Sequence, residues 1–446
     1  MSFPQYPEYK DSGVEWLGEV PAHWEVKRLR YVAELNPSKS EVRTLPSETS
    51  VSFIPMEAVG EDGSLSLEQT RPIGEVLAGY TYFREGDVAI AKITPCFENG
   101  KGAVMSGLEK HVGFGTTELI VMRPKASLTT SNYLYRVVSS EPFRVLGESS
   151  MYGAGGQKRV PDDFVRNFTI AWPPCQEQAE IQAFLDHETV RIDALVEQQR
   201  RLIELLKEKR QAVISHAVKS FGEGPEGKVG YYIDLLPGYA FPSSGFDHDD
   251  GIRLLRGANV SVGSTRWDDV VYWAYDKAQG LDEYWLKEGD LVIGMDRPWI
   301  SGGARVARIR NSDLPALLLQ RVARIRARSG LDQDFLELAL SSQEFKDSIE
   351  ADMTGVSVPH VSPEQISSFR IALPKLDKQS EIAQEARREL DKLENLLEEA
   401  SINISLMQEH RSALISSAVT GKIDVRGWQP PAGSSVTADT TQTEAV

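Results

Sequence analysis

The chain repeats its own sequence, and this internal repetition constrains the fold more than any other feature. Three blocks recur in the same order: residues 84–87 as 287–290, 170–173 as 371–374, and 212–218 as 413–419. The last two recur 201 residues further on and the first 203 residues further on, a difference that one small loop insertion would give. The chain is therefore predicted to hold two copies of one structural unit.

Each copy has the same order of predicted elements. Short runs of β-branched or alternating residues, punctuated by glycine, predict strands near residues 51–54, 87–90 and 118–121, and near 252–255, 290–293 and 321–325. Short helical segments follow near residues 133–149 and 334–351, and a long helix ends each copy. This order predicts a mixed α/β domain of about 150 residues followed by a projecting helix.

The two long helices are the clearest elements. No proline or glycine lies between Pro174 and Gly222, or between Pro374 and Gly421, and Asp377 is placed to cap the second helix. A heptad-like apolar pattern predicts that the helices pack on each other, antiparallel, as a spacer of roughly 60 Å. The alternative is that each helix folds back onto its own domain. The predicted packing residues are Leu185, Ile192, Leu195, Leu202, Leu206, Leu393, Leu396, Met407 and Leu414.

The predicted fold class is therefore α/β (α+β), with two similar mixed domains in tandem, two long antiparallel coiled-coil helices and an internal pseudo-twofold. The tail is rich in Pro, Ser, Thr and Gly, which predicts disorder. The expected segments are an N-terminal segment (1–24), a first domain (25–174), a first helix (175–221), a second domain (222–374), a second helix (375–426) and the tail (427–446).

Sequence signatures of common catalytic sites are missing. The glycine-rich stretch 153–158 has neither the phosphate-loop nor the dinucleotide spacing, and no zinc motif occurs. Two cysteines, Cys96 and Cys175, cannot build a disulfide framework. We therefore predict no catalytic residue, no metal and no cofactor in this chain. The start lacks the pattern of a signal peptide and no apolar run is long enough to cross a bilayer, so we expect a cytoplasmic protein.

The net charge bears on binding to nucleic acid. Lys+Arg 49 against Asp+Glu 65 gives −16, whereas a DNA-binding surface must be basic, so the positions of the basic residues matter. Arginines concentrate in two predicted strands of the second copy. Residues two apart share a strand face, which favours a guanidinium face for phosphates and guanine. The alternative is a solvated or Asp-paired face. These arginines are Arg305, Arg308, Arg310, Arg324, Arg326 and Arg328.

In the first copy the candidate contact is the glycine-rich loop 150–159. Glycines let the backbone approach a phosphate, Gln157 can read adenine, and Lys158 and Arg159 supply charge. The equivalent loop, residues 354–360 with His360, differs completely although its flanks match, as two readers of different DNA sequences would. A flexible connector is the alternative for either loop. Lys92, Lys101 and Arg297 complete the predicted DNA-binding set.

The chain resembles the specificity subunit of type I restriction–modification systems. The likeness covers residues 6–426 and rests on residues 10–18 (Lys-Asp-Ser-Gly-Val-Glu-Trp-Leu-Gly), 21–26, 173–178 (Pro-Pro-Cys-Gln-Glu-Gln) and 414–423. The second copy departs from the family pattern, with Leu-Pro-Lys-Leu-Asp-Lys-Gln at residues 373–379. The departure concerns the start of the second helix.

The resemblance implies the partners and their cofactors. Such subunits read one half of a split target in double-stranded DNA with each domain, and their helices fix the unread spacer. They hold two methyltransferase subunits that use S-adenosylmethionine and, in the full complex, restriction subunits that use ATP and Mg²⁺. We expect Leu205, Leu390 and Leu397 to dock partners. The alternatives are a stand-alone DNA-binding regulator and a coiled-coil protein scaffold.

Overall fold

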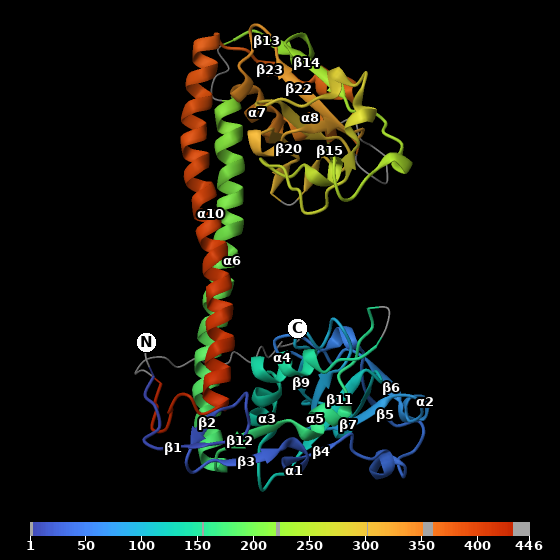
Figure 1. The fold of residues 1–446 in the computed structure, drawn as a ribbon, viewed down its shortest axis with the longest axis vertical. Helices are drawn as coiled ribbons and strands as arrows, with labels where there is room; N and C mark the ends of the chain where they lie inside the picture. Colours follow the sequence, from blue (N-terminus) through green and yellow to red (C-terminus); the bar gives the residue numbers. More distant parts are fainter. Residues whose placement is uncertain (1–2, 154–155, 220–223, 301, 351–359, 431–446) are drawn as a thin grey trace, which may run out of the picture. The chain divides into compact units, whose positions relative to one another are not determined.

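The computed structural model describes residues 3–153, 156–219, 224–300, 302–350 and 360–430. The chain forms two compact units, one of residues 1–197 and 404–446 and the other of residues 198–403. Each unit holds one copy of the repeat and parts of both long helices (Figure 1). The prediction of tandem mixed α/β units with two long helices is confirmed.

The first unit is built on two four-stranded sheets. Its main sheet has the order β4–β11–β8–β9 with antiparallel neighbours, and the second has the order β6–β5–β10–β7 with β5 and β10 parallel. The strands are β4 (Ala33–Leu35), β5 (Ser50–Ile54), β6 (Thr70–Pro72), β7 (Thr81–Arg84), β8 (Val88–Ala91), β9 (Gly102–Val104), β10 (Val112–Gly115) and β11 (Leu119–Pro124).

Smaller elements complete the first unit. A hairpin and a two-stranded ladder lie beside the start of the first long helix, in the N-terminal part of the chain (Figure 1). The strands are β1 (Tyr9–Asp11), β2 (Glu19–Pro21), β3 (Glu25–Arg28) and β12 (Thr169–Trp172). The helices are α1 (Leu29–Val32), α2 (Ile73–Val76), α3 (Ser131–Val138), α4 (Glu141–Ser149) and α5 (Asp162–Asn167).

The second unit repeats this plan, with three strands in place of four in its second sheet. Its main sheet, β14–β22–β17–β20, matches that of the first unit strand for strand, and β15 and β21 are parallel like β5 and β10. The strands are β13 (Glu226–Lys228), β14 (Ile233–Pro237), β15 (Ile252–Leu255), β16 (Tyr272–Trp273), β17 (Leu291–Gly294), β18 (Trp299–Ile300), β19 (Gly303–Ala304), β20 (Val306–Arg308), β21 (Ala316–Leu318), β22 (Val322–Ala327) and β23 (Arg370–Ala372). The helices are α7 (Gln333–Ser341), α8 (Gln343–Glu350) and α9 (Pro363–Ser368).

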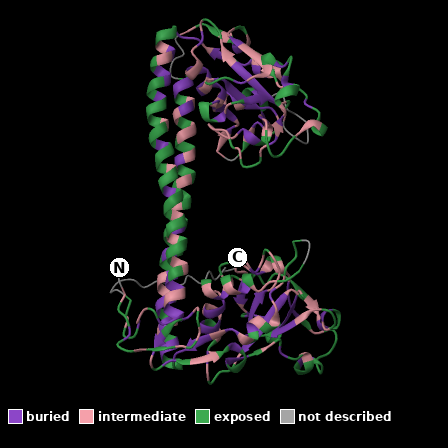
Figure 2. Ribbon diagram, viewed as in Figure 1, coloured by how far each residue is buried: buried purple, intermediate pink, exposed green. Residues whose placement is uncertain are grey.

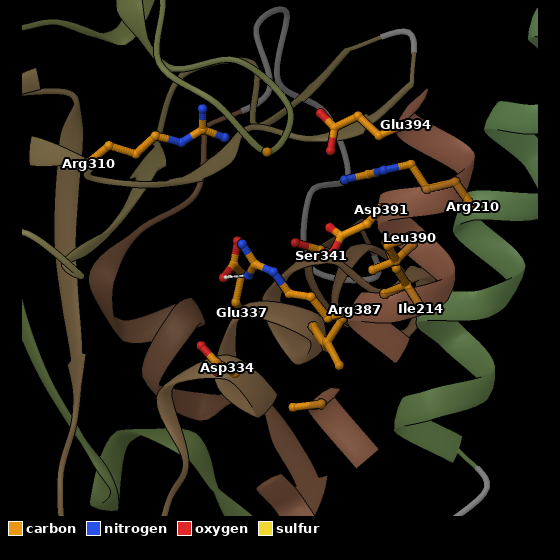
Figure 3. Close-up of a pocket in the computed structure, with 13 residues that line it drawn as sticks. Arg210, Ile214, Arg310, Asp334, Glu337, Ser341, Arg387, Leu390, Asp391 and Glu394 are labelled. Atoms are coloured by element: carbon orange, nitrogen blue, oxygen red, sulfur yellow. Dashed lines mark hydrogen bonds and ion pairs between the residues drawn. The ribbon is translucent and has the colours of Figure 1, made fainter. Parts of the chain in front are cut away.

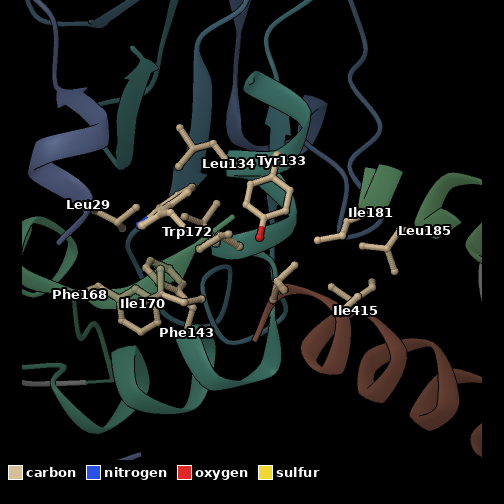
Figure 4. Close-up of a cluster of buried hydrophobic side chains, with 14 of the residues drawn as sticks. Leu29, Tyr133, Leu134, Phe143, Phe168, Ile170, Trp172, Ile181, Leu185 and Ile415 are labelled. Atoms are coloured by element: carbon tan, nitrogen blue, oxygen red, sulfur yellow. The ribbon is translucent and has the colours of Figure 1, made fainter. Parts of the chain in front are cut away.

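The long helices are α6 (Cys175–Lys219) and α10 (Leu376–Val419). In the first unit, the start of α6 and the end of α10 share one core, in which Ile181 and Leu185 lie near Ile415 (Figure 4). In the second unit, the end of α6 and the start of α10 contribute to one core through Ile214 and Ile382. Each core therefore takes in the start of one helix and the end of the other, so within each unit the helices run antiparallel.

The ends of the second helix differ from the expectation. The helix begins at Leu376, so Asp377 lies in its first turn instead of capping it. It ends at Val419, before the expected boundary at 426, because Gly421 adopts a φ of 72° that ends a helix without strain. Residues 427–430, which were predicted to belong to a disordered tail, are described, and Trp428 packs edge-on against Phe184 with ring centroids 5.3 Å apart and lies 5.2 Å from the ring of His187. Residues 431–446 lie outside the described residues.

The predicted packing residues divide into two groups (Figure 2). Leu185, Ile192, Leu206, Leu393 and Leu414 are buried, and Met407 packs against the first core. Leu195, Leu202 and Leu396 are 37%, 40% and 46% exposed, so the structure does not place them in the buried stripe. The buried stripe instead includes Val196 and Ala400, because a narrow two-helix contact covers only part of each apolar face.

Of the three leucines predicted to dock partners, Leu205 is 54% exposed and Leu397 is half-buried. Leu390 packs against the core of the second unit, so its side chain is partly covered within the chain itself. No helix in the described ranges combines the length and the apolar character needed to cross a membrane.

Candidate nucleic-acid interface

Two loops meet at one end of the main sheet in each unit. In the first unit, the loop after β8 meets the segment before α5: Ile93 pairs with Arg159, and the Val160 amide donates to the Lys92 carbonyl at 2.8 Å. In the second unit, Asp296 and His360 form the same pair. We call these places site 1 and site 2. Site 1 comprises Lys92, Lys101, Glu118, Lys158 and Arg159, and site 2 comprises Asp296, Arg297, Arg305, Arg321 and His360.

The backbone frames of the two sites are equivalent. The Lys92 amide donates to the carbonyl of Glu118 at 2.8 Å, and the Met295 amide donates to that of Arg321 at 2.9 Å. The Val361 amide donates to the Met295 carbonyl at 2.8 Å, as Val160 does to Lys92. The two copies thus share a frame and differ in the side chains that it carries, with Glu118 in one copy where Arg321 stands in the other.

Site 1 is organised around one ion pair. Arg159 donates through Nε and Nη2 to the two carboxylate oxygens of Glu118, at 2.9 and 2.8 Å. These hydrogen bonds hold the pKa of Glu118 below its ordinary value. Lys101 Nζ donates to the carbonyl of Met56 at 3.2 Å, and Lys158 is exposed. Site 1 therefore combines the ion pair of Arg159 and Glu118 with the cationic side chains of Lys92, Lys101 and Lys158.

The loop that carries Arg159 is fixed by its own hydrogen bonds. Tyr152 and Arg159 exchange backbone hydrogen bonds of 3.2 and 2.9 Å, and the side chain of Tyr152 is 68% exposed. The Thr94 hydroxyl donates to the Gly156 carbonyl at 2.8 Å and accepts from the Lys158 amide at 3.0 Å. Gln157 is exposed. The predicted residues Lys92, Lys101, Gln157, Lys158 and Arg159 are thus brought together in one place.

Site 2 gathers three arginines and a histidine around Asp296. His360 Nδ1 lies 2.7 Å from Asp296 Oδ1, and Arg321 lies 3.8 Å from the same oxygen. Arg305 donates to the carbonyls of Val260 and Asp296, both at 2.9 Å. Burial lowers the pKa of Arg305, and the nearby cation Arg297 lowers it further. The remainder of the predicted loop, residues 354–359, lies outside the described residues.

Two arginines of site 2 have an unusual backbone. Arg297 and Arg321 have φ of 46° and 73°, in the left-handed region that costs a residue with a Cβ about 1–2 kcal/mol. Both side chains are exposed. Strain of this kind persists where the surroundings hold it, and it is concentrated at functional sites. In the sequence, Arg321 lies in the same basic run as Arg324, Arg326 and Arg328 but was left out of the predicted DNA-binding set, and the alignment of the two copies places it opposite Glu118.

The other predicted arginines do not join these sites. Arg324 is buried and donates to Asp234 at 2.8 Å and to the Glu283 carbonyl at 2.9 Å. Arg326 pairs with the buried carboxylate of Asp290. This arrangement differs from the free guanidinium face expected from the sequence, because partners on neighbouring strands and loops cover the arginines. DNA contact by Arg324 and Arg326 stays a prediction, and the burial of Arg324 and the ion pair of Arg326 argue against it.

Arg308 and Arg310 lie near the helices of the second unit. Arg308 donates to Glu337 at 2.9 Å and also pairs with Asp334. Arg310 is exposed and lines a pocket between the domain and the helices, where acidic and basic side chains alternate (Figure 3). Three arginines and four carboxylates line the pocket, so it has a slight excess of acidic side chains, unlike sites 1 and 2. Arg328 is 60% exposed and only 3.7 Å from Asp234.

The described residues contain no group of three or more His, Cys, Asp and Glu side chains arranged to hold a metal ion. The fold and the two sites define a tandem-domain recognition protein, in which equivalent loop surfaces with different side chains are mounted on a shared helical frame.

Comparison with known proteins identifies the family. The chain is 34% identical to the EcoAI specificity subunit of a type I restriction enzyme from Escherichia coli, over 78% of this chain and 74% of that protein. The chain therefore belongs to the family of type I restriction enzyme specificity subunits. None of the family models compared with the sequence matches it.

Solved structures agree on the fold. A chain from a study of complex assembly and conformational transition in the type I restriction–modification system has a TM-score of 0.65 at 17% identity, covering 90% of this chain and 98% of that one. The HsdS subunit from Thermoanaerobacter tengcongensis has a TM-score of 0.50, with the same identity and coverage. At this identity the likeness concerns the fold alone.

Proposed function

We propose that this chain is the non-catalytic subunit that gives a type I restriction–modification complex its DNA specificity. Each unit reads one half of a split target through its own site, and the chain itself binds no cofactor. The proposal rests on one observation: the two sites have the same backbone arrangement but carry different side chains. Sites 1 and 2 share their backbone hydrogen bonds, yet Glu118 and Arg159 of one stand where Arg321 and His360 of the other stand.

Local charge supports DNA binding despite the acidic chain. Site 1 sets four cations against Glu118, and site 2 sets three arginines and His360 against Asp296. Cations at these places neutralise phosphates, and exposed arginine and glutamine side chains are able to read base edges. The net charge of −16 is that of the whole chain and does not describe these two places, and partner subunits would supply the rest of the basic DNA clamp.

The exposed leucines support docking of two methyltransferase subunits on the helices. Leu202 and Leu205 on α6 are 40% and 54% exposed, and Leu406 on α10 is 55% exposed. Apolar side chains that stay exposed along a helix are typical of surfaces covered by another protein. S-adenosylmethionine would be bound by these partners, and ATP and Mg²⁺ by restriction subunits where the complex includes them.

Domain exchange tests the proposal. Replacing residues 25–172 with the same segment of a relative should change one half of the methylated sequence and leave the other half and the spacer unchanged. Sequencing of methylated sites in the source cell, with and without the exchange, gives the result. If both halves change together, independent reading by the two units is wrong. If no methyltransferase co-purifies with the native chain, a stand-alone regulator replaces the proposal, and if no DNA sequence is selected, a protein scaffold does.

A further inference from the structure

The ion pair of site 1 occupies only one edge of the Arg159 guanidinium. Its guanidinium carries five N–H groups, and Glu118 accepts from Nε and Nη2, along one edge. The opposite edge, formed by Nη1 and the second N–H of Nη2, makes no hydrogen bond to the described residues and remains a parallel pair of donors. A pair of this kind matches two acceptors side by side, such as O6 and N7 of guanine in the major groove.

The positions of the two side chains favour Arg159 as the residue that contacts DNA and Glu118 as the residue that holds Arg159 in place. The side chain of Arg159 is 41% exposed, whereas that of Glu118 is 24% exposed. Glu118 stands directly before β11, a strand of the main sheet, so its carboxylate is held by the framework. The loop of Arg159 is fixed by the Tyr152 and Thr94 hydrogen bonds. An arginine held in this way loses little conformational entropy on binding a base.

Site 2 does not repeat this geometry. Arg321 replaces Glu118 and His360 replaces Arg159, and Asp296 lies 3.8 Å from Arg321, so the carboxylate does not hold that guanidinium in a two-bond fork. At this pair of positions, the fork is therefore present in the first unit and absent from the described residues of the second, where the fork of Arg326 on Asp290 lies at a different place on the main sheet. A function based on it must concern something read by the first unit and not by the second.

We propose that Arg159 reads a guanine in the half-site bound by the first unit, and that Glu118 is the positioning residue that sets its orientation. The inference rests on the proposed function and deepens it by naming one base. Glu118 also limits binding to other sequences, because its charge offsets that of the surrounding cations toward DNA phosphates.

The test is selection of bound duplexes from a random double-stranded DNA library by the full chain with the subunits that co-purify with it. The variants are Arg159→Lys, which keeps the charge but loses the two-donor fork, and Glu118→Gln, which keeps the shape but loses the charge. Glu148→Gln is the matched control, because Glu148 is an exposed carboxylate on α4 of the same unit. Sequencing of the selected duplexes gives the base preference at every position of both half-sites.

The expected result is specific to one base. Arg159→Lys should lower the preference for guanine at one position of one half-site by at least about fivefold, the value of a bidentate contact. Glu118→Gln should lower the same preference and raise the share of unselected sequences. The other half-site should stay unchanged, and Glu148→Gln should match the native chain.

Three results would overturn the inference: an unchanged guanine preference in Arg159→Lys, loss of a base other than guanine, or equal loss in both half-sites. A native chain that selects no split sequence would instead overturn the proposed function itself. Glu118→Gln preserves volume and a hydrogen-bond acceptor, and the second half-site reports on the integrity of each variant.

Discussion

Gln178 and Gln379 are fully buried and make the same hydrogen bonds in the two units. Gln178 Nε2 donates to the carbonyls of Pro173 at 2.9 Å and Leu128 at 2.8 Å. Gln379 Nε2 donates to those of Pro374 at 2.8 Å and Gly330 at 3.1 Å. Each glutamine joins the first turn of a long helix to its domain. The same hydrogen bonds therefore set the direction in which the helix leaves the domain in both units.

Gln379→Ala should therefore lower the stability of the second unit. The Asp332 amide, which donates to Gln379 Oε1 at 2.8 Å, would lose its partner together with two carbonyls. We expect a loss of about 1–3 kcal/mol in the free energy of unfolding, the cost of buried polar groups left unpaired. Urea unfolding measures it. Gln384→Ala, at an exposed position of α10, is the control and should leave the unfolding midpoint in place.

We expect Arg326→Ala to lower the stability of the second unit, so that any loss of DNA binding would follow from the loss of stability. Its partner Asp290 has a side chain only 4% exposed, so the substitution would leave a buried carboxylate unpaired, at a cost of about 3–5 kcal/mol. The pair Asp87 and Arg123 has the same place in the first unit, with hydrogen bonds of 2.7 and 2.8 Å. A structural role common to both units explains the recurrence.

The measurement is thermal unfolding together with binding to target and non-target DNA. Arg328→Ala is the matched control, because Arg328 follows the same strand and is 60% exposed. A variant Arg326→Ala that unfolds like the native chain but loses the second half-site would restore Arg326 to the DNA-binding set.

These arginines show that the sequence predicts the face on which a side chain lies but not the partners that cover it. Alternation along residues 322–327 places Arg324 and Arg326 on one face, and the structure agrees. The pattern of one strand does not say what covers that face, and here Asp234 and Asp290 come from other strands or their flanks. The duplicated blocks, by contrast, predicted both the tandem fold and the long helices, because local repetition and helix breakers need no knowledge of distant partners.

The candidate sites also divide into residues that the local sequence predicted and residues whose importance depends on distant partners. The first glycine-rich loop was predicted from its own residues, and DNA contact by Lys92 and Lys101 stays a prediction. Arg321 was left out of the predicted DNA-binding set although it lies in the same basic run as Arg324, Arg326 and Arg328, and its significance comes from the left-handed backbone and from its nearness to Asp296. Glu118 was missed, since only the structure shows that it holds Arg159.

Glu177→Ala should release the N-terminal segment. The buried carboxylate of Glu177 accepts from the hydroxyl of Tyr6 at 2.7 Å and from Trp24 Nε1 at 3.0 Å, and lies 2.7 Å from His23 Nε2. Burial and this hydrogen bond raise the pKa of Tyr6, so the phenol stays protonated and donates over the whole neutral range. Loss of Glu177 leaves two buried donors unpaired, which costs about 1–3 kcal/mol for each.

Limited proteolysis followed by mass measurement would detect the release as faster cleavage within residues 1–24. Gln176→Ala, at the exposed neighbouring position, should show native cleavage. Equal cleavage of Glu177→Ala and the native chain would contradict the prediction. The second unit has Lys378 at the equivalent position, where it pairs with Glu381 at 2.8 Å, so the carboxylate of Glu177 is not repeated there.

Lengthening both helices should lengthen the unread part of the DNA target. Four residues inserted after Gln198 in α6, matched by four before Ile404 in α10, add one turn to each helix and about 6 Å at 1.5 Å per residue. At 3.4 Å per base pair this corresponds to about two base pairs. Insertion in both helices preserves the antiparallel match, whereas insertion in one would shift its apolar stripe.

Selection from a random duplex library should return the same two half-sites with the longer spacer. The half-site sequences serve as the internal control, since the insertions lie outside both sheets. An unchanged spacer would mean that the helices do not set it.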